Sequence, residues 1–341
     1  MSRLGRFALL TTTAIAGCSE PPPPNLAASS DGAWALVASI DVLADSEVNA
    51  TTIGALLERR PDIDFVIAHD LGLARRAAMA LGSHGHRARI VTIGDMRGPV
   101  LEALESGIVD AAVDDPTHAE DALDLAVLAC LGARAPQSDF SLGTVSLRPE
   151  NATFGGITAP TDDDGSLDDY RALHTELIDH SRGARTLRVG ISVRSLRSDW
   201  QQRFRNAIDD RARSLVVDVE LLEADEAIGQ RSAIERLAQR GIDALVLVTG
   251  DEDVARHAAE VLGDRPLVIA GPPVGGLAHA LGVHTPARAI GAASGRLCRE
   301  LVRSARIVEL RPALDRARAE GISEGLRDAL ALDLPAAQPG R

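Results

Sequence analysis

Histidine and aspartate, the side chains that most often bind metal ions or move protons, occur at several short spacings in this chain. His84 and His86 lie in a polar turn, and Asp114 and His118 are four residues apart, the spacing of one helix face. Neither pair has a third ligand nearby in the sequence, so no metal site is expected. The chain also lacks a G-x-S-x-G motif, a P-loop, a G-x-G-x-x-G loop and a paired cysteine motif. We therefore expect a protein that is not an enzyme and uses no cofactor.

The beginning of the chain has the composition of an export signal. Arg3 and Arg6 precede the apolar run FALLTTTAIAG, which leads into Cys18 and, shortly after it, four prolines. A short basic region, an apolar stretch of about a dozen residues and small residues before a cut are typical of a signal peptide rather than a spanning helix. The IAGC ending resembles a bacterial lipoprotein box. It implies a signal peptide over residues 1–17, a lipid on Cys18 and a Pro-rich tether over residues 18–33, and the alternative is an incidental or buried cysteine.

A lipid anchor would place the protein in the cell envelope, facing the periplasm and touching the membrane only through its lipid. Ser19, rather than Asp, follows Cys18, which resembles the pattern that directs lipoproteins to the outer membrane in enteric bacteria. Which membrane holds the anchor stays open. Cys130 and Cys298 lie in apolar helical patterns, and we expect two buried thiols, with a disulfide between them as the alternative.

Length and charge exclude some classes of partner. The 341 residues suffice for two domains or one bilobal unit, and 45% of them are hydrophobic, as in an ordinary globular protein. The formal net charge of -13 argues against a nucleic-acid partner, because phosphate binding needs a basic face.

From residue 34 onward, short apolar runs alternate with amphipathic helical patterns. Short, nearly all-apolar strands separated by such helices indicate parallel sheets covered on both faces, so the predicted class is α/β, doubly wound. A Gly/Pro/Asp-rich break falls over residues 153–185, whose second half has the apolar stripe of a single docking helix. The predicted strands lie at 34–40, 64–69, 88–94, 109–114, 187–193, 214–222, 243–250, 266–271 and 305–310, and the predicted helices at 48–60, 71–84, 96–107, 199–214, 227–241 and 253–264.

Several of these stretches carry a resemblance to a known family. Residues 58–81, 89–127 and 139–152 (DFSLGTVSLRPENA) look like the closing portion of a type I periplasmic sugar-binding protein of the ribose-binding kind. Residues 187–210, 233–255, 264–271 and 313–330 look like the opening portion of the same family. The two portions stand in reversed order, so the chain resembles a circular permutant. A tandem of two half-proteins is the alternative.

The resemblance implies two lobes joined by three crossings of the chain, near Asp114, Ser141 and His284. Family members close like a hinge on a small polar ligand at the carboxyl ends of their strands. Segment 153–185 would then join the ancestral termini. The implied lobe one comprises 115–141 and 186–283, and the implied lobe two comprises 34–113, 142–150 and 284–332.

The resemblance also assigns ligand contacts. Trp200, at the start of a helix, occupies the place of an aromatic that stacks on a sugar ring, and Arg318 that of an arginine that hydrogen-bonds the ligand. Each has a structural alternative, as a helix staple and as a solvent-facing arginine. The remaining contacts follow predicted strands: His69 and Asp70, which could also form a structural cap, and Asp95 and Asp114.

The chain departs from the family at an important point. Gly271-Pro272-Pro273 stands where sugar binders usually have an Asp-Arg pair that grips ring hydroxyls. The expected function is therefore capture of a small polar solute, sugar-like or related, and ribose itself is not expected to be the ligand. An ABC-type permease or a membrane sensor is the implied partner. The alternative is a scaffold or interaction lipoprotein that has lost its solute.

Overall fold

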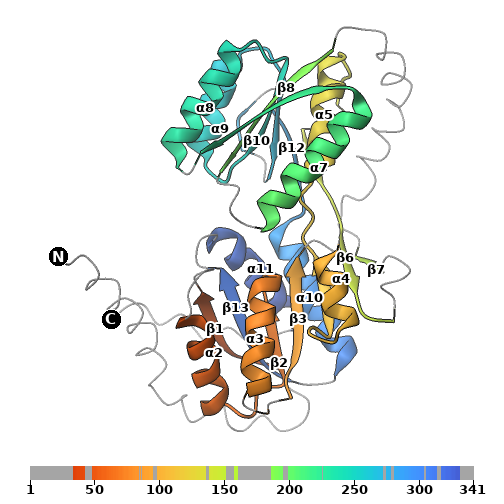
Figure 1. Cartoon of the computed structure of the whole chain (residues 1–341), viewed down its shortest axis with the longest axis vertical. Helices are drawn as coiled ribbons and strands as arrows, with labels where there is room; N and C mark the ends of the chain where they lie inside the picture. The colour runs from red at the N-terminus through yellow and green to blue at the C-terminus, as the bar shows by residue number, and fades with distance from the viewer. Residues whose placement is uncertain are drawn as a thin grey trace, which may run out of the picture.

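The structure, a computed structural model, consists of two α/β bodies that lie one above the other along the long axis of the molecule (Figure 1). We call them lobe one, which contains α5, α7, α8 and α9, and lobe two, which contains α2, α3, α4, α10 and α11. The structure describes residues 34–42, 48–83, 85, 87–94, 98–135, 138–150, 157–159, 186–194, 199–224, 226–271, 274–277, 280–302, 305–312 and 316–330.

The sheet of lobe two has the strand order β1-β13-β2-β3-β4-β6-β7 among the described residues. The first five strands are parallel, and β6 and β7 are added antiparallel at one edge. The strands are β1 (Ala35–Val42), β13 (Arg306–Pro312), β2 (Phe65–Ala68), β3 (Arg89–Gly94), β4 (Ala111–Asp114), β6 (Thr144–Leu147) and β7 (Ile157–Ala159).

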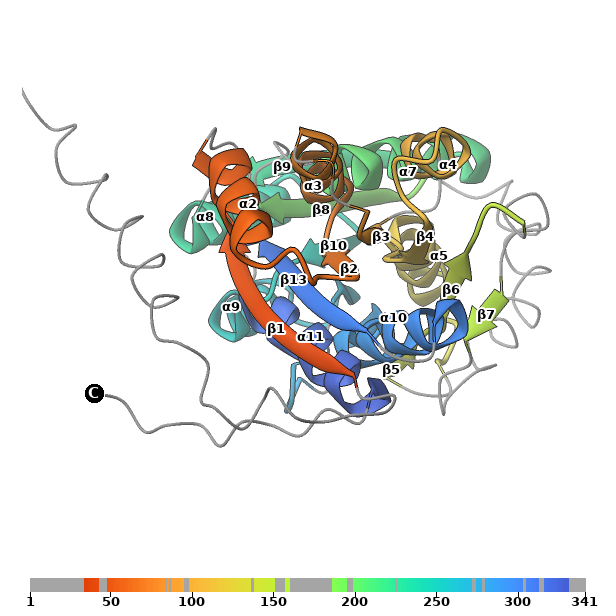
Figure 2. The same ribbon diagram turned by 90° about the horizontal axis from the view of Figure 1, so that it is seen from below.

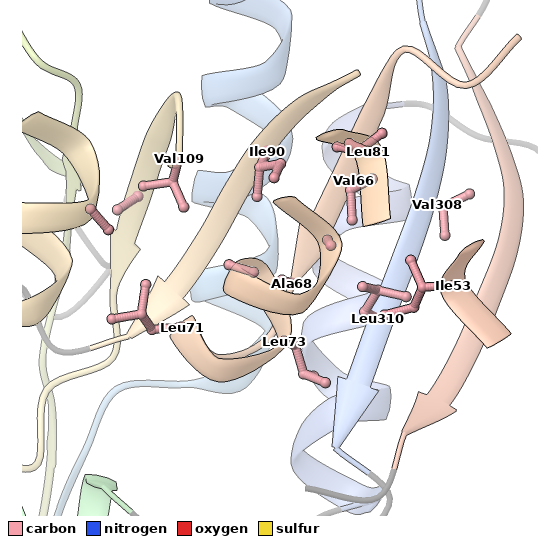
Figure 3. Packing of buried hydrophobic residues seen from close by; sticks show 14 of the residues in the cluster. Ile53, Val66, Ala68, Leu71, Leu73, Leu81, Ile90, Val109, Val308 and Leu310 are labelled. Carbon is pink, nitrogen blue, oxygen red and sulfur yellow. The ribbon is translucent and has the colours of Figure 1, made fainter. Parts of the chain in front are cut away.

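Helices cover both faces of this sheet because both faces of its central strands are apolar. In β2, Val66 and Ala68 pack on one face (Figure 3), whereas Phe65 and Ile67 pack on the other. Figure 2 shows α3 and α4 on one side of the sheet and α10 and α11 on the other. The helices are α2 (Val48–Arg59), α3 (Leu71–Ser83) and α4 (Pro99–Glu105) on the first side, and α10 (Ala287–Leu301) and α11 (Arg316–Leu330) on the second.

Helices α10 and α11 approach each other so closely that their contact requires glycine. A Cβ atom at Gly291 would lie 1.9 Å from the carbonyl oxygen of Ile322, and one at Gly325 would lie 1.9 Å from that of Arg288. Backbone therefore packs directly on backbone, and the two helices form one rigid layer behind the sheet.

The sheet of lobe one is parallel throughout, with the order β5-β12-β11-β10-β8-β9. Helices α5 (Ala119–Cys130) and α7 (Asp199–Leu215) cover one face, and α8 (Ala227–Gln239) and α9 (Glu252–Leu262) cover the other. Both lobes are thus doubly wound, and the predicted fold class is confirmed. The strands are β5 (Asp139–Ser141), β8 (Arg188–Arg194), β9 (Asp218–Ala224), β10 (Ala244–Val248), β11 (Leu267–Ala270) and β12 (Ala280–His284).

Three segments carry the chain between the lobes. Crossover one, residues 115–118, connects β4 of lobe two with α5 of lobe one. Crossover two, residues 142–143, connects β5 of lobe one with β6 of lobe two. Crossover three, residues 285–286, connects β12 of lobe one with α10 of lobe two.

Four described strands, β5, β6, β7 and β12, are absent from the strands predicted by the alternating pattern. Strand β12 is absent from the predicted strands, because its five residues, ALGVH, include a glycine and lie close to a Gly/Pro-rich stretch. Within the break at 153–185, Ile157–Ala159 pair with β6 as strand β7, because backbone pairing at a sheet edge needs little apolar side chain. The docking helix predicted for the second half of that break lies outside the described residues.

The two internal cysteines lie in different lobes and are not joined to each other. Cys298 is buried in α10 of lobe two, and Cys130 is half-buried in α5 of lobe one. Burial raises the pKa of the Cys298 thiol to about 12. The expectation of thiols in separate helices is confirmed, although only Cys298 is fully buried.

Candidate interlobe ligand site

The carboxyl ends of the parallel strands of the two lobes face each other. Strands β4, β5 and β12 each end where the chain leaves one sheet for the other lobe. Because neighbouring parallel strands end at the same edge, every parallel strand of each sheet ends on the side of the opposite lobe. In open α/β sheets this edge is where ligands bind. It is therefore the candidate functional site.

Polar groups tie the three crossovers together at this edge. The Thr144 hydroxyl donates to the carbonyl oxygen of Asp114 at 2.6 Å, and the Leu142 amide donates to that of His284 at 2.8 Å. His118 Nε2 lies 2.9 Å from the hydroxyl oxygen of Thr285. Asp114, a predicted ligand contact, thus uses its backbone to hold the joint, and its partly exposed position at the end of β4 lies on the candidate edge.

Arg318 spans from lobe two to a crossover. It lies in the first turn of α11, and its guanidinium forms an ion pair with the carboxylate of Asp115 in crossover one. The Arg318 side chain is 29% exposed, so solvent reaches part of it. The structure gives this predicted ligand contact a protein partner, and its role toward a ligand stays a prediction.

His69 is directed into the core of lobe two rather than toward solvent. Its Nε2 atom lies 2.8 Å from a carboxylate oxygen of Glu309, and the two side chains are 1% and 0% exposed. The hydroxyls of Ser39 and Ser323 each donate to the same carboxylate at 2.7 Å. His69 Nδ1 has no hydrogen-bond partner among the described residues.

The buried Glu309 is held in its charged form by these neighbours. Burial raises its pKa, but hydrogen bonding and charge from His69, together with the serine bonds, outweigh burial, so that the pKa lies below its ordinary value. This network joins β1, β13, β2 and α11. As placed here, His69 has a structural role, and a contact with a ligand between the lobes stays a prediction.

Asp70 is the cap of α3. Its carboxylate accepts a hydrogen bond from the Leu73 amide at 2.7 Å, which satisfies an otherwise unpaired donor of the first turn. Burial raises the pKa of Asp70 above its ordinary value, and the Leu73 bond and the charge of Arg76 only partly oppose this shift. The structural alternative for the His69-Asp70 pair, a strand-end cap, therefore describes the observed contacts.

The structure describes only some of the remaining predicted positions. Trp200 is in the first turn of α7, but its side chain lies outside the described residues, as do Asp95 and Cys18. Gly271 is described, and its amide donates to the Val283 carbonyl oxygen at 3.0 Å, in the segment where the family's Asp-Arg pair would begin.

Sequence reasoning missed several groups at or near this edge. Asp115, Thr285 and Glu309 were not singled out, although each contacts a residue that was considered. Glu309 carried the clearest signal, since it is the one charged residue inside the otherwise apolar run IVEL.

Two further classes of feature are not found in the part of the chain that the structure describes. No group of three or more His, Cys, Asp or Glu side chains there could hold a metal ion. None of the helices described is long and apolar enough to cross a membrane.

No protein-family model and no curated protein matches this chain. Among solved structures, it is similar to an ABC transporter solute-binding protein from Conexibacter woesei, with 14% identity over 86% of this chain and 85% of that one, at a TM-score of 0.41. A conserved domain protein from Vibrio cholerae matches with 11% identity over 83% and 90%, at a TM-score of 0.35. A Lac repressor dimer bound to operator matches with 15% identity at a TM-score of 0.23, and there the match covers 35% of this chain and only 38% of that chain. All three TM-scores are below 0.5, so these likenesses carry no argument, and the fold class rests on the two sheets themselves.

Proposed function

We propose that this protein is a solute-binding protein that captures a small polar ligand, sugar-like or related, between its two lobes. The observation that carries the proposal is the opposition of two parallel-sheet edges across three crossovers, with Arg318 and Asp114 at the junction. A ligand that contacts both lobes binds the closed arrangement more tightly and shifts the protein toward it. Arg318 would supply a donor fork and Asp114 an acceptor, while Trp200 and Asp95 would complete the site.

We further propose that the chain is a circular permutant within the family it resembles. Counted from β8, lobe one runs β8, β9, β10, β11, β12, and lobe two runs β13, β1, β2, β3, β4. Each sheet then has the same order, second-first-third-fourth-fifth, followed by β5 in lobe one and by β6 and β7 in lobe two. This shared order supports the permutation. It appears only when the elements are counted from β8 to α11 and the count then continues with β1, as if the end of α11 were joined to the start of β1.

The proposal includes the location of the protein. Lipidation of Cys18 would hold the two lobes at a periplasm-facing membrane surface, where a permease or a membrane sensor could receive the ligand. The composition of residues 1–18 supports this. Replacement of Cys18 by Ser should release the protein from the membrane fraction and remove the mass of the lipid.

A second candidate is a scaffold lipoprotein that no longer binds a solute. Two predicted ligand groups, Arg318 and His69, are already engaged by Asp115 and Glu309, which favours this alternative. The absence of the Asp-Arg pair at Gly271-Pro272 favours it as well.

A thermal-unfolding screen distinguishes the two candidates. Residues 31–341 would be heated with sugars, polyols, amino acids or nucleosides at millimolar concentration. A ligand at about 100 times its Kd adds roughly 2.7 kcal/mol to the free energy of unfolding, which raises the Tm by several degrees. Solute capture predicts such a shift for one chemical class and its loss in Arg318→Ala, with Arg213→Ala, an exposed arginine in the last turn of α7, as the control. A flat response from folded protein favours the scaffold.

A further inference from the structure

The three crossovers meet at one histidine and one threonine. His118, at the end of crossover one, places Nδ1 3.0 Å from the Asp121 carboxylate and Nε2 2.9 Å from the Thr285 hydroxyl oxygen in crossover three. The same hydroxyl lies 3.5 Å from the carbonyl oxygen of Gly143 in crossover two. That separation is long for an O–H···O bond.

The backbone of His118 is held in an unfavourable conformation at this point. Its φ and ψ are 51° and 22°, the left-handed region that side chains other than glycine seldom adopt. The ring is only 8% exposed. Strain of this kind persists where surrounding contacts fix it and is concentrated at functional or switching positions.

The charged surroundings of His118 come from several elements. Asp121 of α5 faces its Nδ1. His118 and Arg318 of α11 are both close enough to act on His284 of β12: burial lowers the pKa of His284, and the positive charges of His118 and Arg318 lower it further.

Asp139 of β5 lies 3.3 Å from His284 and opposes the shift of that pKa, and Asp115 of crossover one pairs with Arg318. The Asp121 carboxylate, 3.0 Å from Nδ1 of His118, stabilises a positive charge on that ring.

The single proton of the Thr285 hydroxyl limits how many crossovers this cluster can join. In the neutral ring, the Asp121 carboxylate selects Nδ1 as the protonated nitrogen, so Nε2 is an acceptor and takes the hydroxyl proton of Thr285. The Gly143 carbonyl then receives none. When Nε2 is also protonated, it donates to the Thr285 oxygen, and the hydroxyl is released to donate to Gly143.

We propose that His118 is a proton-operated latch of the interlobe joint. Protonation lets Thr285 connect all three crossovers at once, and deprotonation leaves crossover two without its side-chain link to crossover three. Acid therefore stiffens the joint between the lobes. The inference concerns the protein without ligand and does not depend on the proposed function.

Amide hydrogen exchange of the ligand-free protein tests the latch. Protection factors, corrected for intrinsic exchange, would be measured for a peptide spanning Phe140–Val145 at about pH 5.5 and about pH 8, on either side of the ordinary histidine pKa of about 6.5. We expect protection to be roughly 2- to 10-fold higher in acid, the effect of one net hydrogen bond on a local opening equilibrium. No difference between the two pH values would overturn the proposal.

Two variants separate the latch from other titrating groups. Thr285→Val keeps the shape of the side chain and removes the hydroxyl, so protection should stay at its lower value at both pH values. His257→Gln removes a histidine that faces Glu235 between α8 and α9, away from the joint, and should leave the pH dependence intact. A pH dependence that survives in Thr285→Val, or a ring of His118 that NMR shows protonated at Nε2 alone near pH 8, would contradict the mechanism.

Discussion

Replacement of Gly325 by Ala should destabilise lobe two, although alanine is the better helix former. A Cβ atom there would lie 1.9 Å from the Arg288 carbonyl oxygen and must move out to the 3.4 Å of an ordinary contact, so α10 and α11 must separate by about 1.5 Å. The obstacle is backbone and cannot rotate away. Such overpacking costs about 1–3 kcal/mol, and the helix propensity of alanine returns up to about 1 kcal/mol. We expect a net loss of about 1–2 kcal/mol.

The assay follows the fluorescence of Trp34 during urea unfolding. Trp34 packs beside Phe65, with ring centroids 6.4 Å apart, and therefore reports on lobe two. A Trp200→Phe background removes the only other tryptophan. The matched control is Gly82→Ala, because Gly82 is also helical but a Cβ there meets nothing within 4 Å. That variant should be unchanged or slightly more stable.

The result that would refute the close helix contact is simple. If Gly325→Ala is as stable as its parent while Gly82→Ala behaves as expected, α10 and α11 do not pack backbone against backbone. A loss in Gly325→Ala with the control unaffected supports a closely packed helix pair, whose starting ends both lie at the interlobe edge: Arg318 is in the first turn of α11, and crossover three enters the first turn of α10.

Further expected outcomes follow from buried charges and thiols. Glu309→Gln should lower the free energy of unfolding by about 1–3 kcal/mol at pH 7. Because folding lowers the pKa of Glu309, the stabilisation by this carboxylate is complete above the unfolded pKa of about 4.3 and is lost as the pH falls through the folded pKa. Urea unfolding near pH 3 should therefore show a smaller difference between the variant and its parent. Arg211→Ala should lower the free energy of unfolding, measured in urea at pH 7, by about 2 kcal/mol. The variant leaves the buried Asp124 carboxylate without the guanidinium that donates to it at 2.7 and 2.9 Å. A loss below about 0.5 kcal/mol would mean that solvent replaces the guanidinium. Iodoacetamide near pH 8 should label Cys298 at least tenfold more slowly than Cys130 in the folded protein, because burial raises the pKa of Cys298 to about 12. In urea the two cysteines should be labelled at equal rates, as measured by mass spectrometry. Equal rates in the folded protein would contradict the burial of Cys298.

The sequence predicts the fold class well because the signal is local. Runs such as Phe65–Ala68 are apolar on both faces and are followed by helices with one apolar stripe, which is sufficient for a doubly wound sheet. The crossovers were inferred from a family resemblance and the strand order was not predicted, since pairings between segments as distant as β1 and β13 leave no local pattern.

The polar contacts were less predictable because their partners are far apart in the sequence. His69 reads as a strand-end group free to meet a ligand, but its partner Glu309 is 240 residues away. Arg318 reads as a ligand contact, and its partner Asp115 is 203 residues away. A sequence shows which side chains are polar at a strand end, whereas the packing of a distant helix decides which of them remain available.

The most direct test of solute capture is the distance between the lobes. In residues 31–341, which lack Cys18, spin labels at Ser83→Cys in lobe two and Asp264→Cys in lobe one, with Cys130 and Cys298 replaced by Ala, would report that distance by electron paramagnetic resonance. The same panel of sugars, polyols, amino acids and nucleosides would be added at millimolar concentration. Capture between the lobes predicts that one class narrows the distance distribution and shifts it, and that Arg318→Ala abolishes the change. A distribution that no member of the panel alters would contradict capture by lobe closure.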